Sequence, residues 1–329
     1  MTGMRISVVL CTYNGMRFLR EQLDTVVEQT LTPFEVIVQD DGSTDQTLDI
    51  VREYCQKYPF VKLYQNEATH GVNGNFFSAM RRATGDLIAI CDQDDIWELQ
   101  KLEKMVATIG TNLLCSCRTK PFSEDGAYVD YDERVPNYRL PRLLYASVLG
   151  HSMLFQRKLL DMLPNVDATD YGTVYDVVLG VTAAACGEIV VCNEVLVHQR
   201  RYAAATTISE YDYDRRRKPS IANGLYLLWW SARHFKTVQP YMYSTFRQRK
   251  LMLKDIRGAH SEAYQDAIRI CELEGKPGLL NLLRLSFLFV KHRHHLFYTE
   301  GRGFVNFARA LLYPIMQIYD YRYLVPTKE

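Results

Sequence analysis

The chain has 329 residues, enough for one large domain or for a domain with a substantial appendage. Its 39 basic residues balance 38 acidic ones, so no overall charge directs it to nucleic acid. The eight cysteines show neither the repeated spacing of a zinc site nor the density of a disulfide scaffold, which indicates a reduced, cytoplasmic chain. We expect no signal peptide and no transmembrane helix, because the apolar runs are too short.

The first hundred residues alternate between strand-like and helix-like patterns. We expect strands at 6–10, 34–38, 60–64 and 86–91, and helices at 17–28, from a capping box at 43–46 to about residue 54, and at 75–82. This alternation predicts an α/β fold with a mostly parallel, Rossmann-like sheet and helices on both faces.

The pattern loosens after residue 110. Strands at 112–117 and 189–198 and helices at 159–163 and 177–185 suit an antiparallel addition to the sheet. From about residue 209 the chain becomes helix-rich and aromatic. We therefore expect a domain at 1–208, divided into halves 1–110 and 111–208, and a helical C-terminal region at 209–329.

Polar clusters follow three of the predicted parallel strands, where ligands bind in such sheets. They are Cys11-Thr12-Tyr13-Asn14, Asp40-Asp41-Gly42-Ser43 and Asp92-Gln93-Asp94-Asp95. Carboxylates this crowded repel one another unless a cation or hydrogen-bond donors hold them. Because the chain lacks both GxGxxG and GxxxxGK[ST], a bound nucleotide would need another partner for its phosphates, and a divalent cation on Asp92 and Asp94 is the candidate.

Three segments together resemble glycosyltransferase family 2, which has the GT-A fold. They are SVVLCTYNG at 7–15, FEVIVQDDGSTDQT at 34–47 and GDLIAICDQDDIW at 85–97. The DQDDIW variant is most similar to bacterial rhamnosyltransferase-type members that build lipopolysaccharide and capsular glycans. The resemblance implies a UDP- or dTDP-sugar donor, Mn²⁺ or Mg²⁺, inversion at the anomeric carbon and a glycan or lipid-linked acceptor.

The resemblance also implies roles for single residues. Asp92 and Asp94 correspond to the metal-binding DxD motif, and Asp92 also contacts the donor. Asp95 either orients a ligand or caps a helix that begins near Glu98. The residues expected to contact the nucleotide sugar are Cys11, Thr12, Tyr13, Asp40, Asp41, Asn75, Trp97 and Arg200.

Several of these residues have a plain structural alternative. Asn75 suits a helix N-terminus, Trp97 suits a core anchor, and Arg201 competes with Arg200 for the diphosphate. His151 is expected to be a hydrogen-bonded histidine near the start of a strand.

An inverting transfer needs a general base on the face opposite the leaving group. Asp176 lies where family members place an acidic residue, so we expect it to be this base. Asp167 and Asp170 compete with it, and a carboxylate that only favours a helix N-terminus is the structural alternative.

Two other classes of function remain at this point. A metal-dependent phosphatase of the haloacid-dehalogenase type needs DxDx[TV] after its first strand, where this chain has CTYN. A catalytically inactive relative that only binds would typically have lost the DxD motif or the base, and both candidates are present. In addition, the apolar run at 279–289 with the basic run at 291–295 predicts either a peripheral membrane contact or a helix packed on the catalytic domain.

Overall fold

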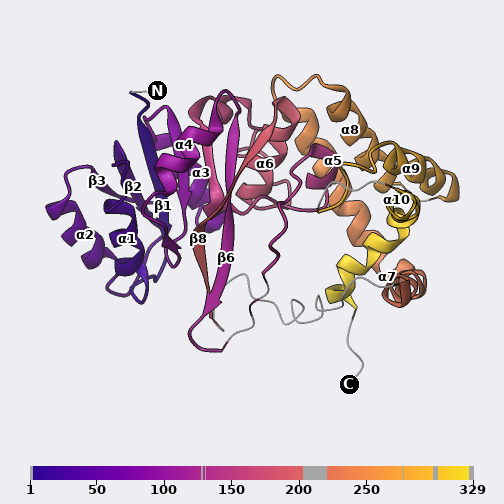
Figure 1. Ribbon diagram of the computed structural model, residues 1–329, viewed down its shortest axis with the longest axis horizontal. Helices are drawn as coiled ribbons and strands as arrows, with labels where there is room; N and C mark the ends of the chain where they lie inside the picture. The colour runs from indigo at the N-terminus through magenta and orange to yellow at the C-terminus, as the bar shows by residue number, and fades with distance from the viewer. Residues whose placement is uncertain are drawn as a thin grey trace. The chain divides into compact units, whose positions relative to one another are not determined.

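The computed structural model describes residues 3–126, 129, 131–202, 221–276, 278–298 and 303–325, which form two compact units (Figure 1). The sheet unit comprises Met1–Val135, Ala146–Leu163 and Thr173–Ala203. The helical unit comprises Pro136–Tyr145, Pro164–Gly172 and Ala204–Glu329. The domain boundary predicted after residue 208 falls outside the described residues.

The sheet unit contains an eight-stranded mixed sheet in the order β3-β2-β1-β4-β7-β6-β8-β5. β1, β2, β3 and β4 run parallel, β7 is antiparallel to both β4 and β6, and β8 pairs with β6 in parallel and with β5 antiparallel. The strands are β1 (Ile6–Thr12), β2 (Glu35–Asp40), β3 (Val61–Gln65), β4 (Leu87–Cys91), β5 (Ile96–Trp97), β6 (Leu114–Ser123), β7 (Met153–Gln156) and β8 (Ile189–Arg201).

The central strands are apolar on both faces because helices cover both. Val8 and Leu10 of β1 pack in the same core as α1, α2 and α4, whereas the side chains between them, such as Val9, point to the opposite face, where α3 contacts β1 and β2. The helices of this unit are α1 (Leu19–Val27), α2 (Thr47–Lys57), α3 (Val72–Arg82), α4 (Lys101–Ile109) and α6 (Tyr175–Cys186). The predicted α/β architecture, a largely parallel sheet with helices on both faces, is confirmed.

Four local predictions differ from the structure. α2 begins at Thr47, and Ser43 bonds to Asp40 and Asn14 and caps no helix, so the capping box is wrong. Residues 159–163 belong to a 3₁₀ segment, η2 (Arg157–Met162). The short strands β5 and β7 were not predicted. Asp95 caps no helix, because α4 begins six residues after it.

The helical unit contains α5 (Leu140–Leu143), α7 (Ile221–Asp255), α8 (Glu262–Glu274), α9 (Leu279–Lys291), α10 (Phe304–Met316) and the 3₁₀ segment η4 (Gln317–Leu324). α7 packs on α8, α8 on α9, and α9 on α10. Phe246 and Phe289 lie in its core, and both rings contact Tyr145. Among the helices described, none combines the length and the apolar content needed to cross a membrane.

Candidate active site

The parallel register brings the predicted polar clusters to one edge of the sheet. Thr12 pairs with Asp40, and Leu10 pairs with Cys91, so β1, β2 and β4 end side by side. Gln93 joins two of the loops, since its side chain accepts from the Tyr13 N–H at 3.0 Å and donates to the Tyr13 carbonyl at 3.2 Å. A Cβ atom at position 15 would lie 2.3 Å from the Gln93 Oε1, so any residue other than glycine would displace the Gln93 side chain.

A group of two carboxylates and an imidazole lies at the end of β4. Asp92 Oδ2 lies 3.1 Å and Asp95 Oδ2 3.3 Å from His151 Nδ1, and one ligand atom of each residue lies within 4.8 Å of the others. His151 comes from η1 (Gly150–Ser152), directly before β7. The fold thus joins two segments about 60 residues apart at one point.

This carboxylate–histidine group fits a divalent cation. Asp95 is buried, and among the described residues its Oδ2 has no hydrogen-bond donor, although Oδ1 accepts from the Arg200 N–H at 3.1 Å. His151 Nε2 lies 3.3 Å from the Thr119 hydroxyl, a partner that can hold the hydrogen on Nε2 and leave the Nδ1 lone pair for a metal. Two carboxylates and one imidazole suit Mn²⁺ better than Mg²⁺, which prefers oxygen ligands alone.

The neighbouring carboxylates change the pKa values of the residues at this site. Burial alone lowers the pKa of His151, but the adjacent Asp95 and Asp92 outweigh it and raise that pKa. Burial, together with the charge of Asp92, raises the pKa of both Asp94 and Asp95. A proton shared among these residues is what a bound metal cation would replace.

A buried lysine lies behind His151. The Lys101 ammonium donates to the His151 carbonyl at 2.7 Å and lies 3.2 Å from the centroid of the Trp97 ring. Burial lowers the pKa of Lys101 to about 8. Trp97 is only 2% exposed, so the structure gives it the core position that was the alternative to a sugar contact.

Asp94 and Arg200 have other partners. Asp94 Oδ2 accepts from the Tyr202 hydroxyl at 2.9 Å, so the structure pairs Asp92 with Asp95 and His151 and leaves Asp94 outside that group. Arg200 is 4% exposed, donates to the Asp94 carbonyl and forms ion pairs with Glu21 and Glu124. These acceptors use three of the five guanidinium N–H groups, so the diphosphate contact stays a prediction.

Asp176 occupies the first turn of α6, as predicted, and its Oδ1 accepts from the Val177 N–H at 2.7 Å. Burial, with a further contribution from the charge of Asp92, raises the pKa of Asp176 to about 6. The preceding Tyr175 is held in place by its N–H bond to Asn73 and by ring stacking on Phe76 at 4.0 Å. Asp167 and Asp170, the competing candidates, belong to the helical unit.

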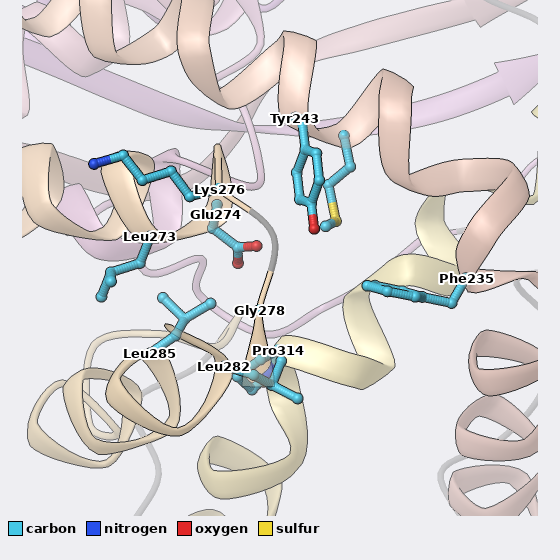
Figure 2. Close-up of a pocket in the computed structure, with 10 residues that line it drawn as sticks. Phe235, Tyr243, Leu273, Glu274, Lys276, Gly278, Leu282, Leu285 and Pro314 are labelled. Carbon is cyan, nitrogen blue, oxygen red and sulfur yellow. The ribbon is translucent and has the colours of Figure 1, made fainter. Parts of the chain in front are cut away.

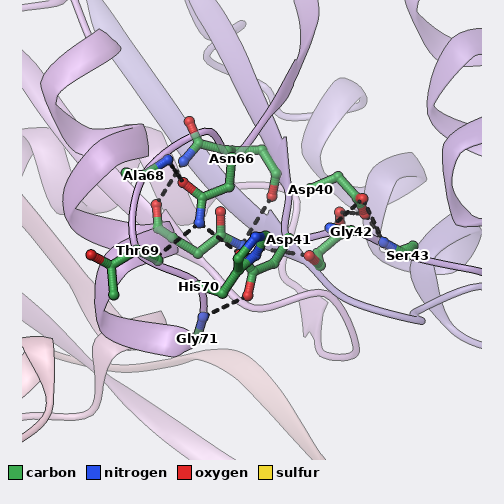
Figure 3. A network of polar contacts seen from close by, with 12 residues as sticks. Asp40, Asp41, Gly42, Ser43, Asn66, Ala68, Thr69, His70 and Gly71 are labelled. Carbon is green, nitrogen blue, oxygen red and sulfur yellow. Dashed lines mark hydrogen bonds and ion pairs between the residues drawn. The ribbon is translucent and has the colours of Figure 1, made fainter.

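The two aspartates after β2 have different surroundings (Figure 3). Asp40 is buried and accepts from the Thr12 hydroxyl, from the N–H of Gly42 and from both the N–H and the hydroxyl of Ser43. Gly42 has φ +91°, a conformation that favours glycine. Asp40 and Thr12 therefore shape the turn from inside.

Asp41 faces the loop after β3. Its Oδ1 accepts from Asn66 at 2.6 Å and lies 3.0 Å from His70 Nδ1, and its Oδ2 accepts from the Gly71 N–H at 2.7 Å (Figure 3). A carboxylate offers about four lone-pair sites, so one more donor can be accepted. His70 itself is largely exposed.

Three further predicted contacts differ in accessibility. Cys11 is buried, and burial raises the pKa of its thiol. Asn75 is also buried, and its amide donates to the Gln39 carbonyl at 3.2 Å and the Thr12 carbonyl at 3.5 Å, which ties α3 to the ends of β1 and β2. Tyr13 is 56% exposed, so its ring is available to a ligand.

Sequence reasoning gave His151 only a structural role and did not single out Lys101. The signal for His151 was its place in Gly150-His151-Ser152, before an apolar strand. Lys101 gave no separate signal, because it opens α4, which looked like an ordinary amphipathic helix.

Comparison with known proteins gives the family. Residues 7–163 match the description Glycosyl transferase family 2. The chain carries a glycosyltransferase family 2 domain. The matched residues include all three polar clusters, the carboxylate–histidine group and Lys101.

One curated relative and two solved structures illustrate what the chain is similar to. The uncharacterised protein Rv1520 of Mycobacterium tuberculosis is 31% identical over 226 residues, covering 64% of this chain and 63% of the relative. The S. aureus TarS 1–349 complex with UDP-GlcNAc has a TM-score of 0.57 at 18% identity and covers 98% and 90% of the two chains. The mannosyltransferase PcManGT of Pyrobaculum calidifontis, in complex with GDP-Man and Mn²⁺, has a TM-score of 0.51 at 18% identity and covers 98% and 85%.

The chain spans between about a third and just under two thirds of the length of the first curated relatives, 34% of one and 63% of another. The two structural similarities support the fold.

Proposed function

We propose that this chain is a metal-dependent, inverting glycosyltransferase that moves a sugar from a nucleoside-diphosphate sugar to an acceptor hydroxyl. The observation that carries the proposal is the group Asp92, Asp95 and His151 at the carboxyl edge of a GT-A sheet, with a second, separately placed carboxylate at Asp176. The carboxylate–histidine group suits a cation that binds the diphosphate leaving group. Asp176 suits a base that takes the proton of the acceptor hydroxyl.

Asp92, Asp95 and His151 would hold the metal. Bound there, a divalent cation neutralises the charge that develops on the diphosphate leaving group. Asp94, assigned to the metal by its DxD spacing, contributes negative charge beside the group, and Tyr202 fixes its orientation. The crystal of PcManGT contains Mn²⁺, which supports the same metal here.

The nucleotide would lie over the ends of β1 and β2. The exposed ring of Tyr13 can pack on the base, and the remaining lone pair of Asp41 can accept the N3–H of a uracil or thymine. TarS was crystallised with UDP-GlcNAc, which supports a UDP- or dTDP-linked donor. Cys11, Thr12, Asp40 and Asn75 shape this surface from below.

Asp176 would act as the general base. The acceptor oxygen attacks the anomeric carbon as the bond to the diphosphate breaks, and its proton passes to the Asp176 carboxylate. A pKa of about 6 leaves Asp176 mostly ionised at neutral pH while keeping it more basic than an ordinary aspartate. Its backbone bond to Val177 holds the carboxylate at the helix end.

The transferred sugar and the acceptor follow from resemblance. The DQDDIW motif favours a hexosyl or rhamnosyl donor and a glycan or lipid-linked acceptor in bacterial cell-surface polysaccharide synthesis, such as lipopolysaccharide or capsule. The alternative is an inactive relative that binds the donor without turning it over. Purified protein with Mn²⁺, tested against UDP- and dTDP-sugars, separates the two: we expect release of nucleoside diphosphate from at least one donor, and binding without release would favour the inactive relative.

A lipid-linked acceptor would bring the chain to the cytoplasmic face of a membrane. On α9, Leu280, Leu283 and Phe287 are 52–72% exposed and recur at helical spacing, and Phe304 and Val305 are exposed on α10. These side chains suit an interfacial contact. The basic run after α9 contributes less than its sequence indicates, because Lys291 pairs with Glu262 and Asp266.

Flotation with anionic liposomes tests this contact. The wild type should float with the liposomes, and Phe287→Glu should reduce the floated fraction several-fold, while Leu31→Glu, at an exposed apolar residue of the sheet unit, should not. A wild type that stays unbound shows that the exposed apolar residues do not dock on a membrane.

A further inference from the structure

The helical unit contains a cavity of about 300 Å³, partly open to solvent, that the proposed transfer does not use (Figure 2). Its walls come from α7, α8, α9 and α10 and from the turn between α8 and α9. The apolar lining residues are Phe235, Met242, Leu273, Leu282, Leu285 and Pro314. This volume is at the lower end of the range for small-molecule sites.

One ionisable side chain interrupts the apolar wall. Glu274 is 3% exposed, and its Oε1 accepts hydrogen bonds from both the Tyr145 hydroxyl, at 2.9 Å, and the Gln317 amide. Within the described part of the chain, its Oε2 has no hydrogen-bond partner. Burial raises the pKa of Glu274 to about 8, so the carboxyl is mostly protonated at neutral pH.

The two bonds to Oε1 decide where the proton lies. An oxygen that already accepts two hydrogen bonds is the carbonyl oxygen of the neutral acid, which leaves the O–H on Oε2. In Figure 2 the Glu274 carboxyl and the Tyr243 hydroxyl point toward the same space. Tyr243 accepts from the Gln239 amide, and its own hydrogen has no acceptor among the described residues.

The cavity therefore presents two hydroxyl donors on a largely apolar wall, and among the described residues that line it the other charged one is Lys276. Lys276, at the rim, is directed to Glu272 at 2.7 Å. Two donors without an acceptor complement an uncharged ligand oxygen. An ammonium group would meet two donors, and a carboxylate would have to be desolvated in an apolar cavity.

We propose that this cavity is a binding site for a small, mainly apolar molecule with an uncharged oxygen head group, such as an aliphatic alcohol, whose oxygen accepts from Glu274 and Tyr243. The half-buried rim residues Phe235, Leu273 and Leu282 give the apolar part its entry. The site is separate from the transfer chemistry and does not depend on the proposed function.

Calorimetric titration of the full chain at pH 7 with n-octanol, n-octylamine and octanoate tests the proposal. We expect saturable one-to-one binding of n-octanol with a Kd below about 1 mM, at least 10-fold tighter than either charged analogue. Absence of saturable binding of n-octanol, or tighter binding of n-octylamine, would overturn the proposal.

Variants locate the site. Leu282→Trp fills the cavity and should weaken n-octanol binding at least 10-fold, whereas Arg284→Trp, on the exposed side of the same helix, should bind as the wild type does. Tyr243→Phe removes one donor and should weaken binding about 2- to 10-fold. If Leu282→Trp does not fold, Tyr243→Phe decides, and wild-type affinity in that variant contradicts the assigned head-group contact.

Discussion

Asp95 of the sheet unit and Glu274 of the helical unit are both buried carboxyls whose pKa is raised by burial, yet their neighbours differ. Asp95 lies among Asp92, Asp94 and His151, and no described residue donates a hydrogen bond to its Oδ2. Glu274 lies among the neutral donors Tyr145 and Gln317. A buried carboxylate beside other carboxylates, such as Asp95, is stabilised by a bound cation. A buried carboxyl group among neutral donors, such as Glu274, is stabilised by keeping its proton.

The largest expected effect concerns the base. Asp176→Asn should lower the rate of sugar transfer about 10²- to 10⁴-fold, because the amide cannot take the acceptor proton. Donor and Mn²⁺ binding should stay at the wild-type level by calorimetry. Asp167→Asn and Asp170→Asn are the matched controls, and loss of transfer in either one with normal transfer in Asp176→Asn would move the base to that residue.

Removal of the imidazole should weaken the metal site. We expect His151→Ala to raise the Mn²⁺ concentration needed for half-maximal transfer by at least about 10-fold, because one of three ligands is lost. His198→Ala removes a histidine that pairs with Glu98 on the same unit and should leave this concentration unchanged. Equal Mn²⁺ requirements in the two variants would exclude His151 from the site.

The pH dependence of transfer should report Asp176. The base must be ionised, so transfer at saturating donor and Mn²⁺ should fall about 10-fold per pH unit below the pKa of Asp176, which burial raises above its ordinary value. The residual activity of Asp176→Asn should not show this fall at low pH. A wild-type rate that is constant from pH 7 to pH 5 would argue against a titrating base.

Lys101 should support the fold behind the site. Lys101→Met keeps the length of the side chain but removes the donor to the His151 carbonyl, and we expect a loss of about 1–3 kcal/mol in the free energy of unfolding. Lys104→Met, on the exposed side of α4, loses only a surface ion pair with Glu194, worth about 0–1 kcal/mol. Urea denaturation of both variants measures the difference.

Glu274 should couple the stability of the helical unit to pH. Between the ordinary pKa of 4.5 and the folded value of about 8, the folded state binds more protons than the unfolded state, so stability falls as pH rises. The slope is at most about 1.4 kcal/mol per pH unit. Glu274→Gln should flatten it, whereas Glu272→Gln, an exposed neighbour, should not, and equal slopes in both variants would show that Glu274 is ionised.

The parallel half of the sheet was predictable because its strands are continuous apolar runs separated by amphipathic helices. β5 and β7 were missed because β5 has two residues and β7 has four, too few for a period to appear. The capping box failed because Ser43 bonds back to Asp40 and Asp45 bonds forward to Thr47. Local hydrogen bonds of the β2 turn thus overrode a helix signal.

The candidate site was predictable in place but less so in detail. The predicted ends of the strands were enough to place Asp41 and Asp92 at the edge of the sheet. They did not indicate the directions of the side chains. Which carboxylate joins Asp92 depends on the turn after β4, which directs Asp95 to His151 and Asp94 to Tyr202. The two-residue spacing of Asp92 and Asp94 in the sequence does not reveal that His151, directly before β7, lies beside Asp92 and Asp95.

Calorimetric binding of UDP and dTDP with Mn²⁺ and with chelator tests the central claim, that Asp92, Asp95 and His151 hold the metal that the donor diphosphate needs. For the wild type, we expect at least one of the two nucleotides to bind at least 10-fold tighter with Mn²⁺, and we expect His151→Ala to lose that gain while keeping the affinity measured in chelator. Equal affinity of the wild type for both nucleotides with and without Mn²⁺ would contradict the claim.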